Sequence, residues 1–203
     1  MPIKSDREYR NLGSLELDPE DIVTGYASTF DQYELFTDFD GTKLYERIDR
    51  HAFDNADMTD VVFLRDHAGR VLARTKNGSV QLFTDDHGLA TRTNLGLTEA
   101  SKEMLEDIRV GNYSQMSFSF VVGRDHFDWI DDKTAVRVID SISKVYDVSA
   151  VAFPANPYTD IGVSARSLLD GAIDERAAER LKAELKDRAR KALQLKVRLQ
   201  KGE

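Results

Sequence analysis

Short apolar stretches, separated by turns rich in Gly, Asn and Asp, fill the first 165 residues. The clearest lies at 115–120, where Met116, Phe118 and Phe120 take every second position and polar residues stand between them. A period of two places apolar side chains on one face of a β-strand and polar side chains on the other. The pattern therefore predicts a half-buried strand over residues 115–123.

Similar stretches predict further strands and few helices. A helix is expected at 99–110, where Met104, Leu105 and Ile108 form an apolar stripe and Gly111 follows as a stop. A short helix is expected at 50–56, a loop at 31–41, and hairpin turns at 76–79, 86–88 and 131–133. The other expected strands are 12–17, 22–30, 44–48, 60–64, 71–75, 80–84, 89–95, 127–130 and 136–153.

This order of elements predicts a mainly β fold with flanking helices, of the α+β class. Many short strands with few helices favour a closed or nearly closed β-barrel. At 203 residues with 41% hydrophobic side chains, the chain is long enough for one compact domain and an appendage.

The pattern changes near residues 165–171, where Ala, Leu, Lys, Arg and Glu begin to dominate. Residues 170–203 hold ten Lys or Arg against seven Asp or Glu, a net charge of +3, whereas residues 1–169 hold eighteen against twenty-nine, a net charge of −11. We therefore expect a domain over residues 1–166 and a charged amphipathic helix over residues 167–203. If that helix projects from the domain, residues 158–166 are expected to form an exposed hinge.

The C-terminal helix fits a heptad repeat that is typical of helix pairing. One alternative is that the helix packs on its own domain, and the other is that it projects and pairs with another copy or a partner segment. The heptad positions are Ala178, Leu185, Ala192 and Leu199 in one row, and Leu181, Arg188 and Leu195 in the other.

Composition excludes several kinds of functional site and argues against two classes of partner. The absence of cysteine excludes disulfides, thiolate zinc sites and a cysteine nucleophile, and fits a reducing cytosol. No apolar run reaches the length of a membrane span, and the net charge of −8 argues against nucleic-acid binding. We expect neither a membrane nor a nucleic acid as partner.

Ser117 is a candidate nucleophile because a rigid strand holds it above large apolar side chains. A serine hydroxyl needs a base within hydrogen-bond reach, and the base needs a third group that fixes its tautomer. His67, which follows the apolar strand 61–64, is the candidate base, and Asp147, flanked by apolar residues, is the candidate acid. Together they form a candidate triad in the order His, Ser, Asp.

Other interpretations of these residues stay open. Ser119 and Ser149 are rival nucleophiles by residue type, and His51, His87 and His126 are further histidines. Asp147 is equally explained as one partner of a structural ion pair. Metal binding at 85–87 or 125–128 is less favoured than solvated turns, because the histidines are scattered and no metal-binding motif is present. We expect no metal and no cofactor.

An ordered set of segments between residues 10 and 165 resembles the prohead (capsid-maturation) serine proteases of tailed phages, a family related in fold to the herpesvirus assemblins. By this resemblance Ser117 is the nucleophile, His67 the general base and Asp147 the acid. The chain departs from the family pattern at Arg50-His51, at Ser119 and at Asp147, where the family often has Glu. The matching segments are Gly25-Tyr26-Ala27 with Phe30, Tyr45-Glu46-Arg47-Ile48, Ala52-Phe53, the segment around His67, Gly88-Leu89, Gly111 to Phe118, Asp147 to Val151 and Pro154 to Pro157.

The resemblance implies an assemblin-like β-barrel and a serine endopeptidase that acts inside the immature phage shell. Its implied substrates are the major capsid protein and its scaffold segment, and the hinge at 158–166 is a candidate site of self-cleavage. The implied location is the interior of the procapsid, with the host cytoplasm before assembly, and self-association is expected. Two alternatives remain: an inactive capsid-assembly module on the same fold, and a different hydrolase that uses the carboxylates.

Overall fold

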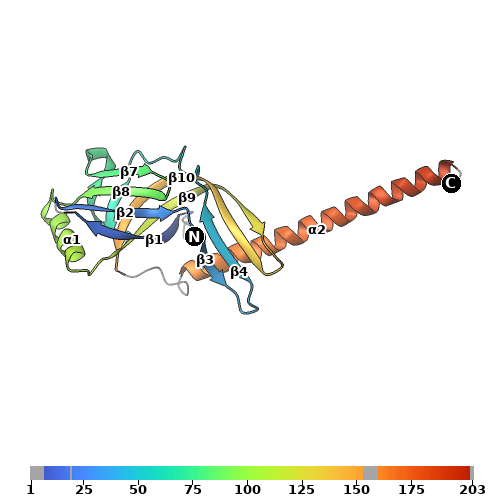
Figure 1. Ribbon diagram of the computed structural model, residues 1–203, viewed down its shortest axis with the longest axis horizontal. Helices are drawn as coiled ribbons and strands as arrows, with labels where there is room; N and C mark the ends of the chain where they lie inside the picture. Colours follow the sequence, from blue (N-terminus) through green and yellow to red (C-terminus); the bar gives the residue numbers. More distant parts are fainter. Residues whose placement is uncertain (1–6, 19, 153–159, 202–203) are drawn as a thin grey trace, which may run out of the picture.

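The computed structural model describes residues 7–18, 20–152 and 160–201, and it is mainly β with two α-helices (Figure 1). The expected α+β class is confirmed. The helices are α1 (Glu99–Arg109) and α2 (Asp160–Lys201), and a 3₁₀ turn covers Thr75–Asn77. The strands are β1 (Glu8–Leu17), β2 (Ile22–Thr29), β3 (Tyr33–Thr37), β4 (Lys43–Ile48), β5 (Val62–Arg65), β6 (Ala68–Arg74), β7 (Val80–Thr84), β8 (Gly88–Asn94), β9 (Gln115–Trp129) and β10 (Thr134–Val151).

The two longest strands, β9 and β10, form the centre of the sheet as one long antiparallel pair. The other edge of β10 is shared: β4 pairs in parallel with residues 134–139 and β5 pairs in parallel with residues 147–150. On the far side of β9 the order continues through β1, β2, β8 and β7. Strand β10 therefore contacts three strands, β9 along one edge and β4 and β5 along the other.

The strands curve around one main core, but their pairing stays open. Val23 of β2, Phe63 of β5 and Phe118 of β9 are fully buried in the same apolar cluster. Among the described strands, however, β6 pairs only with β5, and β7 pairs only with β8. The closed form of the predicted barrel is therefore wrong. The turn at 76–79 connects β6 to β7 without pairing them, so the hairpin expected there is also wrong.

Helix α1 closes one end of this core, as its sequence predicts. Its first turn has a reciprocal cap between Thr98 and Ser101, and its apolar stripe of Met104, Leu105 and Ile108 is buried in the main cluster. Gly111 follows with a positive φ of 83°, a conformation that glycine adopts without steric cost.

Helix α2 begins earlier than expected, and its described contacts with the sheet and the β9–β10 turn lie in its first half, up to Arg180. Ala165 and Leu169 are buried against Leu35 of β3 and Leu44 of β4. The hinge predicted at 158–166 is therefore wrong over residues 160–166, and residues 158 and 159 lie outside the described residues. The predicted domain boundary at 166/167 falls inside this packed helix.

Beyond Arg180 α2 extends away from the sheet into solvent (Figure 1). Every described side chain from Ala177 to Gln194 is exposed, including Leu181 and Leu185 of the heptad. The side chains of Leu195 and Leu199 lie outside the described residues. The interpretation that the helix packs on its own domain therefore holds for its beginning only.

Two further expectations are wrong. Residues 50–55 form successive turns rather than a helix, held by bonds such as Ala52 N–H to Asp49 C=O. The segment expected as a loop at 31–41 contains β3, which pairs antiparallel with β4 through Tyr33–Thr37. Its side chains have mixed polarity because β3 forms an edge of the sheet and buries only Leu35 fully.

Candidate active site

Four polar side chains form a patch on one face of the β9–β10 pair. Ser117 lies opposite Ser149, and Ser119 lies opposite Asp147. Positions two apart on a strand share a face, and residues that are opposite across an antiparallel pair are close neighbours. All four residues are buried, so their polar atoms must find partners within the protein.

His67 reaches this patch from a tight turn between β5 and β6. Arg65 pairs with Ala68, which leaves Asp66 and His67 as the two turn residues, and both have positive φ, 46° and 58°. Such turns match the twist of antiparallel strands and usually contain Asn or Gly. Because β5 runs parallel to β10, with Leu64 beside Ser149, the turn lies at the edge of the patch.

Asp66 fastens the turn to its surroundings and does not serve as the acid beside His67. Its N–H donates to the carbonyl of Ala150 at 3.0 Å, and its carboxylate accepts from the Tyr113 hydroxyl at 3.1 Å. Left-handed backbone at a non-glycine residue costs free energy and persists where the surroundings fix it. The contacts of Asp66 provide that fixation.

The structure brings His67, Ser117 and Asp147 together. His67 Nδ1 lies 2.6 Å from Asp147 Oδ1, and His67 Nε2 lies 2.6 Å from Ser117 Oγ. An ionised carboxylate only accepts hydrogen bonds, so Nδ1 carries the proton and Nε2 of the neutral ring is left to accept one. The arrangement is that of a nucleophile, a base and an orienting acid.

The two rival serines hold the carboxylate of Asp147. Ser119 Oγ donates to Oδ2, and Ser149 Oγ donates to Oδ1 at 2.8 Å. Ser149 also lies 3.3 Å from His67 Nδ1, which is the nitrogen already bonded to Asp147. Among these three serines, only Ser117 contacts Nε2, the nitrogen that is free to take a proton.

The environment keeps Asp147 ionised. Burial alone would raise the pKa of its carboxyl group, but hydrogen bonds from His67 and Ser119 outweigh this effect, and the pKa lies below its ordinary value. An anionic Asp147 stabilises the imidazolium that forms when His67 takes a proton. The carboxylate therefore suits the role of an orienting acid.

One edge of His67 is covered by Tyr9 of β1. The two rings meet edge to face, with centroids 4.7 Å apart. The imidazole side chain keeps 18% of its surface exposed, whereas Ser117 is 3% exposed. Of the three residues, His67 is therefore the most open to solvent.

The remaining histidines have other partners. His51 contacts Asp54 at 3.1 Å, His87 packs on the Tyr26 ring, and His126 contacts Asp140 at 2.9 Å. The contact with Asp140 raises the pKa of His126. No group of three or more potential metal ligands occurs among the described residues, and the acidic residue Asp125 pairs with Arg137 instead.

Sequence reasoning did not identify one set of residues next to this site. Arg10 and Glu46 form a buried ion pair, and the Arg10 carbonyl accepts a hydrogen bond from Ser117 Oγ at 2.8 Å. The two charged residues are 36 positions apart and stand in ordinary strand patterns. Nothing in the sequence marks them as partners.

Comparison with protein families gives one match: residues 10–172 fit the family described as caudovirus prohead serine protease. The match includes His67, Ser117 and Asp147, and it ends where the buried turns of α2 end. No curated protein matches the chain significantly, and no solved structure does so. Within the described residues, neither helix has an apolar stretch long enough to cross a membrane.

Proposed function

The chain belongs to the caudovirus prohead serine proteases, and from this membership we propose that Ser117, His67 and Asp147 are its catalytic nucleophile, base and acid. One observation carries the proposal. A single imidazole lies between the serine hydroxyl and the buried carboxylate, with 2.6 Å on each side. These distances are within the reach needed for proton transfer and for fixing the tautomer.

The reaction follows from these positions. Ser117 Oγ attacks the carbonyl carbon of a peptide bond while its proton passes to His67 Nε2. His67 then gives that proton to the leaving amine, the C–N bond breaks, and an acyl ester remains on Ser117. A water molecule then attacks the ester while His67 takes its proton, and His67 returns that proton to Ser117 Oγ as the C–O bond breaks and the second fragment leaves. Throughout the reaction Asp147 accepts the hydrogen bond from His67 Nδ1–H and remains ionised.

Ser119 and Ser149 support this chemistry by holding the carboxylate. Their hydroxyls donate to the two oxygens of Asp147, so the carboxylate cannot rotate away from His67 without losing buried hydrogen bonds. They are positioning residues in this proposal, and Ser117 alone is the nucleophile.

The proposed substrates are the major capsid protein and its scaffold segment, cut within the immature shell. The family acts in the prohead, and this is what supports the assignment. Before assembly the protein would reside in the host cytoplasm. We also propose that it cuts copies of itself. A cut within the helical part of α2 would require local unwinding, because proteases cut extended, poorly packed backbone.

The part of α2 beyond Arg180 is proposed as an assembly tail that contacts scaffold or another copy. Leu181 and Leu185 are 58% and 55% exposed. Leucines at heptad positions are normally buried against a second helix, so their exposure indicates a surface that binds a partner. Residues 170–203 carry a net charge of +3 against −11 for the rest of the chain. An apolar row with flanking charges suits a helical partner.

A serine-directed fluorophosphonate probe tests the catalytic assignment. The native protein should become labelled, and Ser117→Ala should abolish labelling while the melting temperature stays close to that of the native protein. His67→Ala should slow labelling by orders of magnitude. Undiminished labelling of Ser117→Ala would overturn the assignment and direct attention to Ser119 and Ser149.

A further inference from the structure

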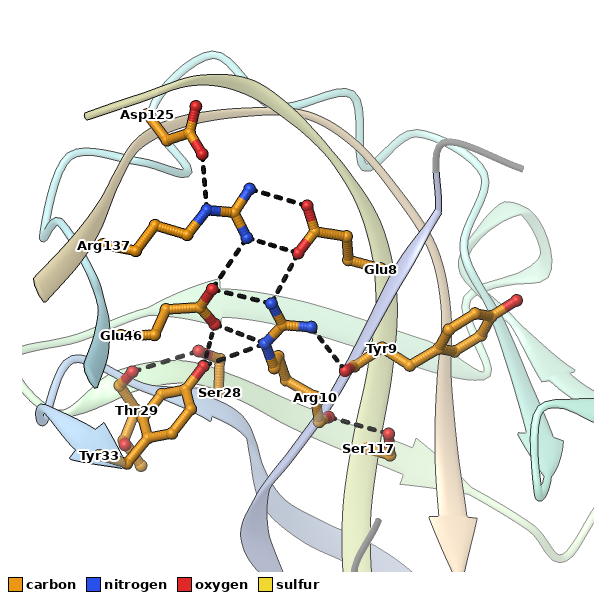
Figure 2. Close-up of polar contacts among 10 residues, drawn as sticks. All are labelled: Glu8, Tyr9, Arg10, Ser28, Thr29, Tyr33, Glu46, Ser117, Asp125 and Arg137. Carbon is orange, nitrogen blue, oxygen red and sulfur yellow. Dashed lines mark hydrogen bonds and ion pairs between the residues drawn. The ribbon is translucent and has the colours of Figure 1, made fainter. Parts of the chain in front are cut away.

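Beside the triad lies a buried network of charged side chains, shown in Figure 2. Glu46 of β4 is fully buried and accepts from Arg10, from Arg137 and from the Tyr33 hydroxyl. These residues and their further partners are called the buried ion network here because its centre, Arg10, Glu46 and Arg137, is buried, while the other members are half-buried. The network consists of Glu8 and Arg10 of β1, Tyr33 of β3, Glu46 of β4, Asp125 of β9 and Arg137 of β10.

The two arginines use most of their donors within this network. Arg10 Nη2 lies 2.8 Å from Glu46 and 2.6 Å from Glu8, and Arg10 Nε contacts Glu46 and Tyr33. Arg137 Nη1 lies 2.6 Å from Glu8 and 2.9 Å from Glu46. The Arg10 side chain thus ties β1 to two strands that it does not pair with, β3 and β4.

Such a network is a poor device for stability alone. Taking charges out of water carries a large desolvation cost, and well-packed apolar residues of similar volume often stabilise a protein as much or more. Burial by itself would raise the pKa of Glu46, and the two arginines instead lower it to about 2. What the network provides is a fixed position for β1, because Glu8 and Arg10 of this strand make many directional bonds with other strands.

Strand β1 contacts both the proposed base, His67, and the proposed nucleophile, Ser117. Tyr9 lies against the His67 ring, and the Arg10 carbonyl accepts from Ser117 Oγ at 2.8 Å. Arg10 pairs with Phe118, the neighbour of Ser117, and its guanidinium lies 5.7 Å from the Phe120 ring centroid. Because side chains alternate along a strand, the Arg10 side chain lies on the sheet face opposite Ser117 while its carbonyl remains beside the hydroxyl.

The hydroxyl of Ser117 has one proton and two acceptors within reach, His67 Nε2 and the Arg10 carbonyl. One proton cannot serve both acceptors at once, but both lie around the same position of Oγ, so rotation about the Cβ–Oγ bond passes the proton from the carbonyl to Nε2 while Oγ stays 2.6 Å from Nε2. A small displacement of β1 would remove the carbonyl from this position and let Oγ leave that rotamer. Misplacement of a reacting group by about 1 Å costs about 100-fold in rate.

We propose that Arg10 is a positioning residue for the nucleophile: its side chain locks β1 into the buried ion network, and its carbonyl then holds Ser117 Oγ in the rotamer that places it 2.6 Å from His67 Nε2. The inference rests on the proposed role of Ser117 as nucleophile. It assigns to the network a kinetic role in addition to any effect on folding.

The test compares the rate of fluorophosphonate labelling per folded molecule in full-length variants. Arg10→Met combined with Glu46→Gln removes the pair without leaving an unpaired buried charge on Glu46. This double variant should label about 10- to 100-fold more slowly, through a lower maximal inactivation rate with an unchanged probe affinity. Arg10→Lys keeps the charge but not the fork of donors, so its rate should lie between those of the native protein and the double variant.

Arg74→Met combined with Asp60→Asn is the control for loss of a two-bond ion pair away from the site, because Arg74 Nε and Nη2 of β6 lie 2.5 and 2.7 Å from Asp60, which precedes β5. This pair is more exposed than that of Arg10 and Glu46. The control variant should leave the labelling rate of the folded protein unchanged. A native labelling rate in the Arg10 and Glu46 double variant would overturn the inference. If that variant does not fold, a native rate in folded Arg10→Lys would overturn it instead. If Ser117→Ala still labels, the proposed function itself fails, which is a separate outcome.

Discussion

His67 and Asp147 are 80 residues apart in the chain, yet His67 Nδ1 lies 2.6 Å from Asp147 Oδ1. The contact exists because β5 runs parallel to β10 and delivers the β5–β6 turn to the edge of the strand that carries Asp147. Parallel pairing between distant segments is costly in loop entropy and must be held by packing. Here Phe63 of β5 and Val148 of β10, which are direct neighbours in the pairing, are both fully buried.

Asp147→Asn should lower the turnover of capsid protein by about 10²- to 10⁴-fold, because an amide no longer selects the His67 tautomer with the proton on Nδ1. The melting temperature and the rate are measured on the same preparation. A lower melting temperature with a normal rate for the folded fraction would show that Asp147 is only a structural ion-pair partner.

Ser119→Ala and Ser149→Ala should each reduce turnover by about 3- to 30-fold and lower the stability by about 1 to 3 kcal/mol, because each leaves a buried oxygen of Asp147 with one donor fewer. Steady-state kinetics and thermal unfolding measure the two effects. Complete loss of activity in either variant, with Ser117→Ala still active, would make that serine the nucleophile.

Acid should destabilise the protein through Glu46. Its pKa is lowered from 4.5 to about 2, so the folded state favours the ionised form. A lowered folded-state pKa gives stability that is complete above the unfolded value and is lost as pH falls toward the folded value. The melting temperature should therefore fall between about pH 4.5 and pH 2.

The matched control for this pH effect is the double variant Arg10→Met with Glu46→Gln, which cannot titrate at residue 46. It should lose less of its melting temperature across the same pH window. Parallel melting curves for the two proteins would contradict a role of Glu46 in acid stability.

Shortening α2 should have different effects at two positions. A chain ending at Arg180 keeps Leu169 and Ala172 in the core and the contacts of Arg176 and Arg180 with Asp132, so it should fold and cut normally but enter immature shells poorly. A chain ending at Arg166 loses the fully buried Leu169, which alone is worth about 1.5 to 3 kcal/mol. That chain should melt at a lower temperature.

Peptide hydrolysis, melting temperature and shell incorporation distinguish the two shortened chains. Normal incorporation of the chain ending at Arg180 would exclude the proposed assembly tail. Equal melting temperatures for the two chains would show that the buried turns of α2 contribute little to the fold.

The strong local patterns were sufficient for much of the fold. The alternation around Ser117 predicts β9, and the stripe of Met104, Leu105 and Ile108 predicts α1. Strand β3 was missed because an edge strand with one fully buried residue has no clear period. The open pairing of β6 and β7 was missed because local pattern does not specify which strands meet.

In the candidate site, too, local sequence patterns predict some residues, whereas others become neighbours only through the pairing of distant strands. Ser117 and Asp147 stand in strands whose patterns are visible in the sequence, so their residue types could be singled out. The turn that carries His67 has no glycine, and its two left-handed residues, Asp66 and His67, give no sequence signal for so tight a connection. The buried partners Arg10 and Glu46 become neighbours only through the assembled sheet.

The most direct test of the account is cleavage of the matching capsid protein in co-expression, with the products identified by mass spectrometry. The native protease should give defined fragments, and Ser117→Ala, folded and present at equal level, should leave the capsid protein intact. Loss of Ser117 or of His67 alone should reduce cleavage by about 10⁴-fold or more, with little further loss in the double variant, because the members of a triad act as a unit. Near-normal cleavage by Ser117→Ala would show that Ser117 is not the nucleophile that His67 and Asp147 activate.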